Sequence, residues 1–283
     1  QKLIFSNMTA EKDDYSSTKL SYPLEDGPHD AYDKLMQTLY SPEELKKIEW
    51  SIGSIVAGAS TEVQKFVVLY GGYGTGKSTA LDIIKSLFNG YYNVFNAKAL
   101  GSSSGTFSLE PFKDSPLVAL QYDGDLSKIE DNIRLNSLIS HEEMVVNTKY
   151  GKLYSQEFSS FLFMGTNKPV KITDSKSGII RRLLDVSPTG NRVSRKEYLQ
   201  LMSQIKFELS GIAWHCKRVF EKDPDYYDDY IPLNMIAETN DLYDFVFEYY
   251  DTFAERDSIT LSGAWEKSTA FYDHAAIKYP LTR

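Results

Sequence analysis

The chain has 283 residues, of which 42% are hydrophobic and 25% are charged. These proportions are ordinary for a globular protein, and the length allows one large or two modest domains with an ample core. The formal net charge of −8 excludes a surface built uniformly for nucleic acid, so any such contact has to be local, in a channel or on a loop. No run is long and apolar enough to span a membrane.

The cysteine content suits a reducing compartment. The single cysteine, Cys216, excludes an intrachain disulfide framework, and its simplest role is that of a small buried hydrophobe on a helix. His215 and Cys216 are adjacent and cannot face one side of a helix together, and no other cluster has zinc spacing, so we predict no structural metal. No signal peptide leads the chain, and because it begins at Gln1 rather than Met, we expect a fragment of a longer protein.

The first part of the chain predicts a lead-in with two helices. Residues 1–40 mix short apolar pieces with turn-forming residues and end in a short helix. A second helix is expected over 42–56, because Ser41 is an N-cap residue and Glu44 is placed for a capping box. Gly58 is expected to end this helix.

A glycine-rich turn between a strand and a helix is the most specific motif. Residues 66–70 are apolar or aromatic and predict a buried strand, and apolar residues recur at helical spacing from Thr79 onward. The turn matches G-x-x-x-x-G-K-[ST], in which backbone N–H groups and a helix N-terminus bind phosphate. We expect Lys77 to reach the β- and γ-phosphates of a nucleotide and Ser78 to hold Mg²⁺. The predicted nucleotide-binding residues are Gly71, Gly72, Gly74, Thr75, Gly76, Lys77, Ser78 and Thr79.

Two aspartates follow another apolar strand. Strands are expected over 91–95, before the glycine- and serine-rich residues 101–105, and over 116–122, which leads into Asp123 and Asp125. In a P-loop ATPase a buried strand beside the P-loop strand carries such acids, because Mg²⁺ needs a carboxylate and the attacking water needs an orienting base. The alternative is a surface Asp-Gly turn, since a glycine separates the two acids.

Residues 140–154 predict a β-hairpin whose tip carries two cations and an aromatic ring. Lys149 and Lys152 can pair with the phosphates of a single strand, and Tyr150 can stack on a base. A solvated charged turn is the alternative. The position of the hairpin directly before the next strand motif favours the nucleic-acid interpretation.

Residues 160–169 predict an apolar strand that ends in a polar Thr-Asn pair. Asn167 can hydrogen-bond the γ-phosphate or the attacking water, as a sensor of the nucleotide state. Further on, Arg181 and Arg182 directly precede a short strand. An arginine there can reach the γ-phosphate of a neighbouring subunit and stabilise charge in the transition state, although the pair can also make surface salt bridges only.

From residue 194 the pattern is helical. Helices are expected between 196 and 220, near 241–255 and over 261–279, with a break rich in proline and tyrosine at 223–227.

Together these motifs resemble the superfamily 3 helicases of the AAA+ class, and more narrowly the helicase part of phage and poxvirus-type primase-helicases. The resemblance covers roughly residues 41–220 and rests on Lys-Phe-x-Val-Leu-Tyr-Gly-x-x-Gly-Thr-Gly-Lys-Ser-Thr, Asp-Gly-Asp-Leu, Ser-His-Glu-Glu-Met and Phe-Leu-Phe-Met-Gly-Thr-Asn-Lys-Pro. It implies Walker A roles for Lys77 and Ser78, Walker B roles for Asp123 and Asp125, a channel hairpin with Lys149 and Lys152, a sensor at Asn167, and an arginine finger at Arg181 or Arg182. Many members have adjacent acids in Walker B, so the choice of base between the two aspartates stays open, as does the choice of arginine.

The implied fold is an α/β AAA+ P-loop core over 59–193, with a mainly parallel sheet between helices. A helical lead-in over 1–58 and a helical segment over 194–283 flank it. The implied function is that of an ATP-driven, ring-forming DNA helicase or translocase, with ATP between subunits and single-stranded DNA in the central channel. The ring is expected to be a hexamer, and Mg²⁺ is expected to bind with ATP at Ser78 and Asp123.

The same resemblance places the chain in the DNA replication of a phage or mobile element, in the host cytoplasm and without a membrane partner. The module is expected to belong to a larger protein or assembly with a primase or polymerase. Two rival functions remain open. One is a packaging ATPase or RNA helicase on the same core. The other is a nucleotide-gated module that loads or anchors a polymerase, against which the Walker B, sensor and arginine candidates stand.

Overall fold

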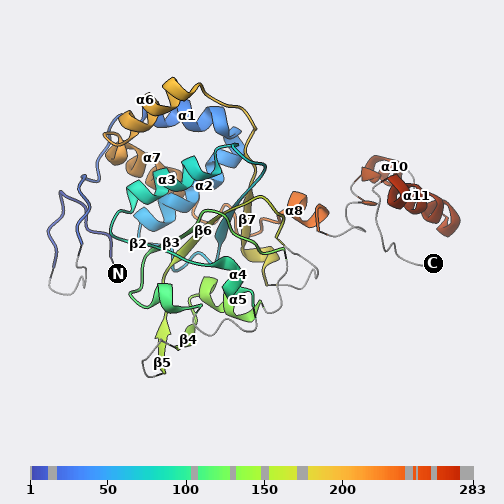
Figure 1. The fold of residues 1–283 in the computed structure, drawn as a ribbon, viewed down its shortest axis with the longest axis horizontal. Helices are drawn as coiled ribbons and strands as arrows, with labels where there is room; N and C mark the ends of the chain where they lie inside the picture. Colours follow the sequence, from blue (N-terminus) through green and yellow to red (C-terminus); the bar gives the residue numbers. More distant parts are fainter. Residues whose placement is uncertain are drawn as a thin grey trace. The chain divides into compact units, whose positions relative to one another are not determined.

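The computed structural model describes residues 2–11, 18–102, 108–127, 132–147, 153–170, 178–239, 245–246, 248–255 and 260–274 (Figure 1). The chain divides into two compact units, a first unit Gln1–Pro232 and a second unit Leu233–Arg283. The segments expected from the sequence, 1–58, 59–193 and 194–283, have other boundaries and stay a prediction.

A five-stranded parallel sheet forms the centre of the first unit. The strands lie in the order β2-β3-β6-β1-β7, and every neighbouring pair is parallel. All residues of β6 are buried, as expected for a central strand that is covered on both faces. The predicted α/β core with a mainly parallel sheet between helices is therefore confirmed. The bounds are β1 (Phe66–Tyr70), β2 (Tyr92–Val94), β3 (Val118–Gln121), β6 (Phe161–Thr166) and β7 (Leu183–Val186).

The strand that leads into the two aspartates does not lie beside the P-loop strand. β6 lies between them, with Leu162 of β6 opposite Ala119 of β3 and Phe163 of β6 opposite Val67 of β1. β3 is thus second from β1 in the sheet, while its acidic end still lies close enough to the P-loop for Asp123 to act on Lys77. Parallel strands are joined by crossover connections, so their order in the sheet is free to differ from their order in the chain.

Helices lie on both sides of this sheet. Figure 1 draws α1, α2, α3, α6 and α7 above it and α4 and α5 below it. The helical stretch expected between 196 and 220 is two helices, α6 and α7. The bounds are α1 (Asp30–Leu39), α2 (Pro42–Val56), α3 (Lys77–Leu87), α4 (Ala97–Leu100), α5 (Ile133–Ile139), α6 (Arg195–Ile205) and α7 (Leu209–Lys222), with 3₁₀ turns η1 (Glu110–Phe112) and η2 (Ile180–Arg182).

The start of α2 is tied to the end of β7. The Ser41 hydroxyl accepts a hydrogen bond from the Glu44 N–H at 3.4 Å, as the predicted N-cap requires. The Glu44 carboxylate does not complete a capping box. It accepts from the Ser187 N–H at 2.7 Å and pairs with Lys47 at 2.8 Å. At the other end, Gly58 has a φ of +77°, which suits its predicted role as the helix stop.

Helices from the two ends of the first unit pack into one layer, in which α1 contacts α6 and α2 contacts α7. Glu208, directly before α7, is buried, and its carboxylate accepts hydrogen bonds at 3.1 Å from the N–H groups of Ala31 and Tyr32. It thereby satisfies N–H groups at the N-terminus of α1 that have no partner within that helix. Where α2 crosses α7, a Cβ added to Gly53 would lie 2.1 Å from the carbonyl oxygen of Cys216. The layer therefore depends on close approach of the two backbones.

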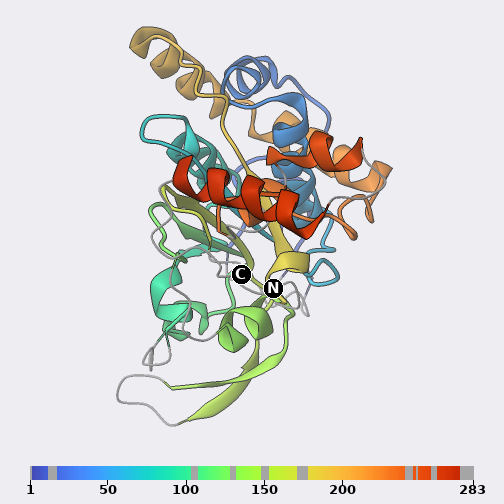
Figure 2. The same ribbon diagram turned by 90° about the vertical axis from the view of Figure 1, so that its right-hand side faces the viewer.

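A hairpin extends from the first unit. β4 (Glu143–Val146) and β5 (Tyr154–Glu157) pair in antiparallel fashion as a separate two-stranded sheet. Figure 2 shows the two strands projecting away from the five-stranded sheet. The predicted hairpin is therefore confirmed, whereas its predicted tip residues lie outside the described part of the chain; these are Lys149, Tyr150 and Lys152.

The second unit contains α8 (Leu233–Ala237), α10 (Tyr250–Ala254) and α11 (Leu261–His274). Phe245, Phe271 and Tyr272 form a small buried aromatic cluster in this unit. The helices expected near 241–255 and over 261–279 correspond to α10 and α11 within the described residues. Across the described parts of both units, no helix has the length and apolar character needed to cross a membrane.

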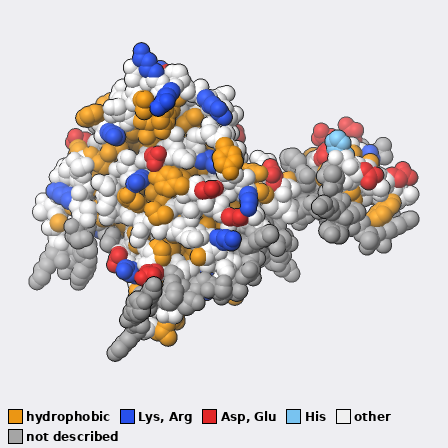
Figure 3. All heavy atoms as spheres, in the orientation of Figure 1, with side chains coloured by type: hydrophobic (Ala, Val, Ile, Leu, Met, Phe, Trp, Pro, Cys, Tyr) orange, Lys and Arg blue, Asp and Glu red, His pale blue; other side chains and the backbone are white. Residues whose placement is uncertain are grey.

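Basic side chains are not gathered on the face of the molecule in Figure 3. Lys and Arg lie scattered among acidic and apolar side chains there, as far as the described residues show. This mixed surface agrees with the inference from net charge that contact with nucleic acid has to be local.

Candidate nucleotide-binding site

The P-loop joins β1 to α3 through a turn that two glycines make possible. Gly74 and Gly76 have φ angles of +70° and +102°, a left-handed conformation that glycine adopts without steric cost. The loop also packs tightly against the end of α1. A Cβ added to Gly76 would lie 2.9 Å from Leu39, and the Tyr40 hydroxyl donates to the Gly76 carbonyl at 3.2 Å.

The Lys77 side chain lies across the loop. Its ammonium donates to the carbonyl oxygens of Gly71 and Gly72, each at 2.6 Å, and to Asn167 Oδ1 at 2.8 Å. Burial lowers the pKa of Lys77, and the negative charge of Asp123 opposes that shift. The structure thus brings the predicted Walker lysine into direct contact with the predicted sensor asparagine, with one of the two aspartates close enough to act on the lysine.

These groups meet at one edge of the sheet. Gly71, Asp123 and Asn167 follow the carboxyl ends of β1, β3 and β6, and parallel strands present those ends at the same edge. The turn after β3 lies against β6, because the Gly124 N–H donates to Gly165 O at 2.7 Å. A Cβ on Gly124 would lie 2.3 Å from Met164 Sδ. This close approach explains why a glycine stands between the two acids.

The two aspartates have different surroundings. The Asp125 carboxylate accepts hydrogen bonds from the Ser127 N–H at 3.0 Å and the Ser127 hydroxyl at 2.5 Å, and it pairs with Lys168 at 2.7 Å. The hydrogen bond from Lys168 and those from Ser127 hold the pKa of Asp125 well below its usual range. Asp123 is exposed and its charge acts on Lys77. Asp125 is therefore an anchor of the turn, whereas Asp123 is exposed and lies close enough to Lys77 for its charge to act on the ammonium.

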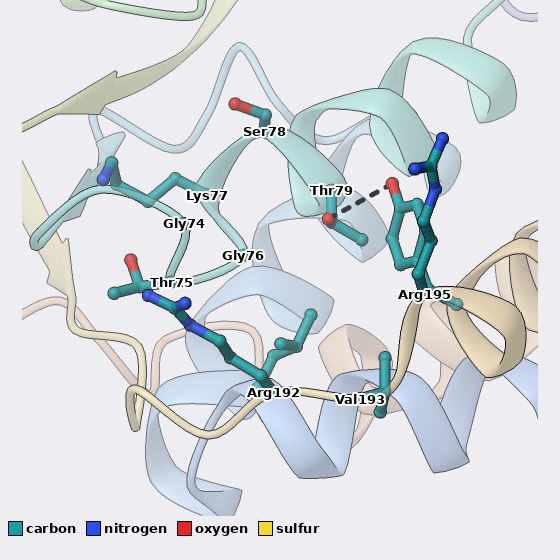
Figure 4. A pocket seen from close by; sticks show the side chains of 11 residues that line it. Gly74, Thr75, Gly76, Lys77, Ser78, Thr79, Arg192, Val193 and Arg195 are labelled. Carbon is teal, nitrogen blue, oxygen red and sulfur yellow. Dashed lines mark hydrogen bonds between the residues drawn. The ribbon is translucent and has the colours of Figure 1, made fainter.

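A cavity of about 390 Å³ adjoins the loop (Figure 4). Arg192 extends toward the loop, and its Nη2 lies 3.4 Å from Tyr73 O. Thr79 Oγ1 lies 3.5 Å from the Tyr198 hydroxyl on α6. Three cations, Lys77, Arg192 and Arg195, therefore line one cavity, which suits a polyphosphate. The lining residues are Leu39, Gly74, Thr75, Gly76, Lys77, Ser78, Thr79, Arg192, Val193, Arg195 and Tyr198.

The sequence motifs do not predict the cavity residues that lie outside the P-loop and α3. Their signal in the sequence is weak. Arg192 and Arg195 flank Ser194, whose hydroxyl accepts from the Glu197 N–H at 3.2 Å and caps α6. The pattern that could have indicated these residues is a pair of arginines around the start of a helix. This helix follows β7, whose carboxyl end lies at the same edge of the sheet as the P-loop.

The two predicted arginine fingers lie at the opposite edge of the sheet. Both are in η2, directly before β7, and Leu183 of β7 pairs in parallel with Phe66, the first residue of β1. With about 3.3 Å per strand residue, roughly 15 Å of β1 separates them from the P-loop. Arg181 is exposed, whereas Arg182 is buried. Neither arginine is placed to serve the cavity of its own chain.

The loop, the sheet and the polar groups at its carboxyl edge define an α/β P-loop protein. A family model described as a family of unknown function (DUF5906) matches residues 69–182. No curated protein matches the chain.

Two solved structures share the fold. The apo structure of the NrS-1 C terminal region aligns with a TM-score of 0.52 and 16% identity, over 87% of this chain and 63% of that one. The A form apo structure of the same region aligns with a TM-score of 0.51 and 16% identity, over 88% of this chain and 64% of that one. This chain therefore spans less than two thirds of the length of either structure.

Proposed function

We propose that this chain is an ATP hydrolase and the motor module of a ring-forming DNA helicase or translocase. The observation that carries the proposal is the contact of Lys77 with Asn167 at the sheet edge that also holds Asp123. A phosphate-binding lysine, a polar sensor and a carboxylate are the groups that phosphoryl transfer to water needs.

The cavity residues fit a nucleoside triphosphate with Mg²⁺. Lys77 would exchange its two carbonyl contacts for phosphate oxygens, and Arg192 and Arg195 would add positive charge beside the phosphates. Ser78 and Asp123 supply the hydroxyl and carboxylate oxygens that Mg²⁺ prefers. When bound there, Mg²⁺ would neutralise phosphate charge. Asn167 and Asp123 would orient the attacking water.

Arg181 supports a ring of identical subunits. An exposed arginine at the amino edge of the sheet cannot serve a cavity at the carboxyl edge of the same chain, but it can serve that of a neighbouring copy. Contacts between two different edges are heterologous, and repeated heterologous contacts close into a ring when the rotation allows it. A hexamer is the expected form. Hydrolysis would then depend on assembly.

The β4–β5 hairpin supports contact with nucleic acid. Its strands project from the sheet. The sequence between them includes Lys149, Tyr150 and Lys152, which suit one strand of DNA in the hole of a ring. The larger protein or assembly would supply primase or polymerase activity in the replication of a phage or mobile element, in the host cytoplasm.

ATP turnover and strand displacement test this function together. Lys77→Ala and Asp123→Asn are expected to lower kcat for ATP by about 100-fold or more, because each removes a group that acts on the phosphates. Asp125→Asn is the matched control and should retain most of the turnover, since Asp125 faces Lys168 and Ser127. Forked DNA and forked RNA substrates distinguish a DNA helicase from an RNA motor. Assembly without hydrolysis in the unmodified chain would instead favour a nucleotide-gated loading module.

A further inference from the structure

Arg182 joins η2 to the root of the hairpin. Its Nε and Nη2 both donate to the Ser140 hydroxyl, at 3.0 and 2.5 Å, and its Nη1 donates to Gly178 O at 2.8 Å. The side chain is buried, and a Cβ added to Gly178 would lie 2.6 Å from Nη1. All three donor nitrogens of this guanidinium therefore face protein oxygens in a site with no spare room.

Ser140 lies where the hairpin begins. It caps the C-terminus of α5, and β4 starts three residues later. The next residue, His141, has a φ of +58°, and its ring nitrogens lie 2.8 Å from Phe158 O and 3.2 Å from Ser60 O. Because Phe158 directly follows β5, both strands of the hairpin are fixed at this root.

The backbone of the neighbouring Arg181 is held by Lys65, which precedes β1. Lys65, directly before β1, is buried, and its ammonium donates to Arg181 O at 2.7 Å and to Asp228 O at 3.1 Å. Burial lowers the pKa of Lys65. Consecutive residues of η2 thus differ in their surroundings. Arg181 is exposed to solvent, whereas Arg182 is buried and donates hydrogen bonds to Ser140 at the root of the hairpin.

We propose that Arg182 is a positioning residue that passes movement of Arg181 to the β4–β5 hairpin through Ser140. This inference rests on the proposed motor function and adds the route by which a phosphate bound to a neighbouring copy would move the hairpin. Because Nε and Nη2 donate to the same oxygen, the Ser140 hydroxyl is held between these two nitrogens and follows the guanidinium when it moves. A shift of η2 when Arg181 engages phosphate therefore displaces Ser140 and the strands that follow it.

The test uses Ser140→Ala in the assembled protein, with Ser140→Thr as the matched control that keeps the hydroxyl. The quantities measured are ATP turnover with single-stranded DNA and the base pairs of forked DNA unwound per ATP. Ser140→Ala should keep ATP turnover within about twofold and lower unwinding per ATP roughly 2- to 30-fold, the range found for residues that carry coupling between sites. Ser140→Thr should resemble the unmodified protein. Arg182→Lys, which retains charge but loses the two-nitrogen contact, should repeat the Ser140→Ala result.

Two outcomes would overturn the inference alone. The first is that the unmodified protein unwinds DNA and Ser140→Ala unwinds the same number of base pairs per ATP. The other is a fall in ATP turnover in Arg182→Lys as large as that in Arg181→Ala, since this would make Arg182 a phosphate-contacting residue. Failure of the unmodified protein to unwind DNA would overturn the proposed function as well. Thermal unfolding of each variant shows whether the fold is retained.

Discussion

Lys77 donates all its described hydrogen bonds to oxygen atoms near the place where phosphate would bind. Two of these oxygens belong to its own loop and one to Asn167, so the proposed binding of a nucleotide would replace partners that Lys77 already has. Asn167 and Lys168 are adjacent, and they link β6 to the P-loop on one side and to Asp125 on the other. Consecutive residues after β6 thus contact both the P-loop lysine and the turn that carries the two aspartates.

The Asp125 anchor makes a prediction about acid stability. Its pKa is lowered in the folded protein, so below the unfolded value of about 3.9 the unfolded chain binds a proton that the folded chain does not. The stability that Asp125 contributes is present above about pH 4 and is lost as the pH falls toward the lowered folded pKa. Urea unfolding of the unmodified protein and of Asp125→Asn should differ at pH 6, and the difference should shrink below pH 4. A difference that grows in acid would contradict the anchoring role.

Much of the candidate site could be predicted from the sequence, because its motifs consist of residues that are consecutive in the chain. The P-loop occupies consecutive residues, and Asn167 ends a strand with an unmistakable apolar run. The distinction between Asp123 and Asp125 was not legible, because it depends on Lys168, which only the sheet brings near. The separation of Arg181 from Arg182 likewise depends on what each side chain contacts after folding.

At the scale of elements, the helical layer is built from both ends of the first unit. The N-cap and stop of α2 follow from Ser41 and Gly58, which are local signals. The pairing of α1 with α6 and of α2 with α7 joins helices more than 100 residues apart, and no local pattern fixes it. The same holds for the order of the strands, where β6 separates β3 from β1.

Gly53 is expected to be irreplaceable at the crossing of α2 and α7. Gly53→Ala places a Cβ 2.1 Å from a backbone oxygen of Cys216, which cannot move without shifting α7. We expect a loss of about 3 kcal/mol in the free energy of unfolding, measured by urea titration. Gly72→Ala is the control, because no heavy atom lies within 4 Å of its added carbon. Equal stability of the two variants would mean that the helices do not cross this closely.

At the scale of the whole molecule, the first unit carries its candidate functional residues at both ends of the parallel strands. The carboxyl edge of the sheet holds the cationic cavity, and the amino edge holds Arg181 and the root of the hairpin. The overall charge of −8 is compatible with this division, because Lys77, Arg192 and Arg195 line a cavity and need no broadly basic surface. Under the proposed function, a subunit with its cavity at one edge and Arg181 at the other would need a neighbouring copy to complete its site.

Mixing two inactive variants tests this claim most directly. Lys77→Ala keeps Arg181 but lacks a working cavity, and Arg181→Ala keeps the cavity but lacks the arginine. In a random equal mixture about a quarter of the contacts between subunits join an intact cavity to an intact arginine. We therefore expect recovery of roughly a quarter of the unmodified ATP turnover, and no recovery when Arg181→Ala is mixed with the double variant Lys77→Ala/Arg181→Ala. The shared site would be contradicted if mixed rings form but the mixture of Lys77→Ala and Arg181→Ala hydrolyses ATP no faster than either variant alone.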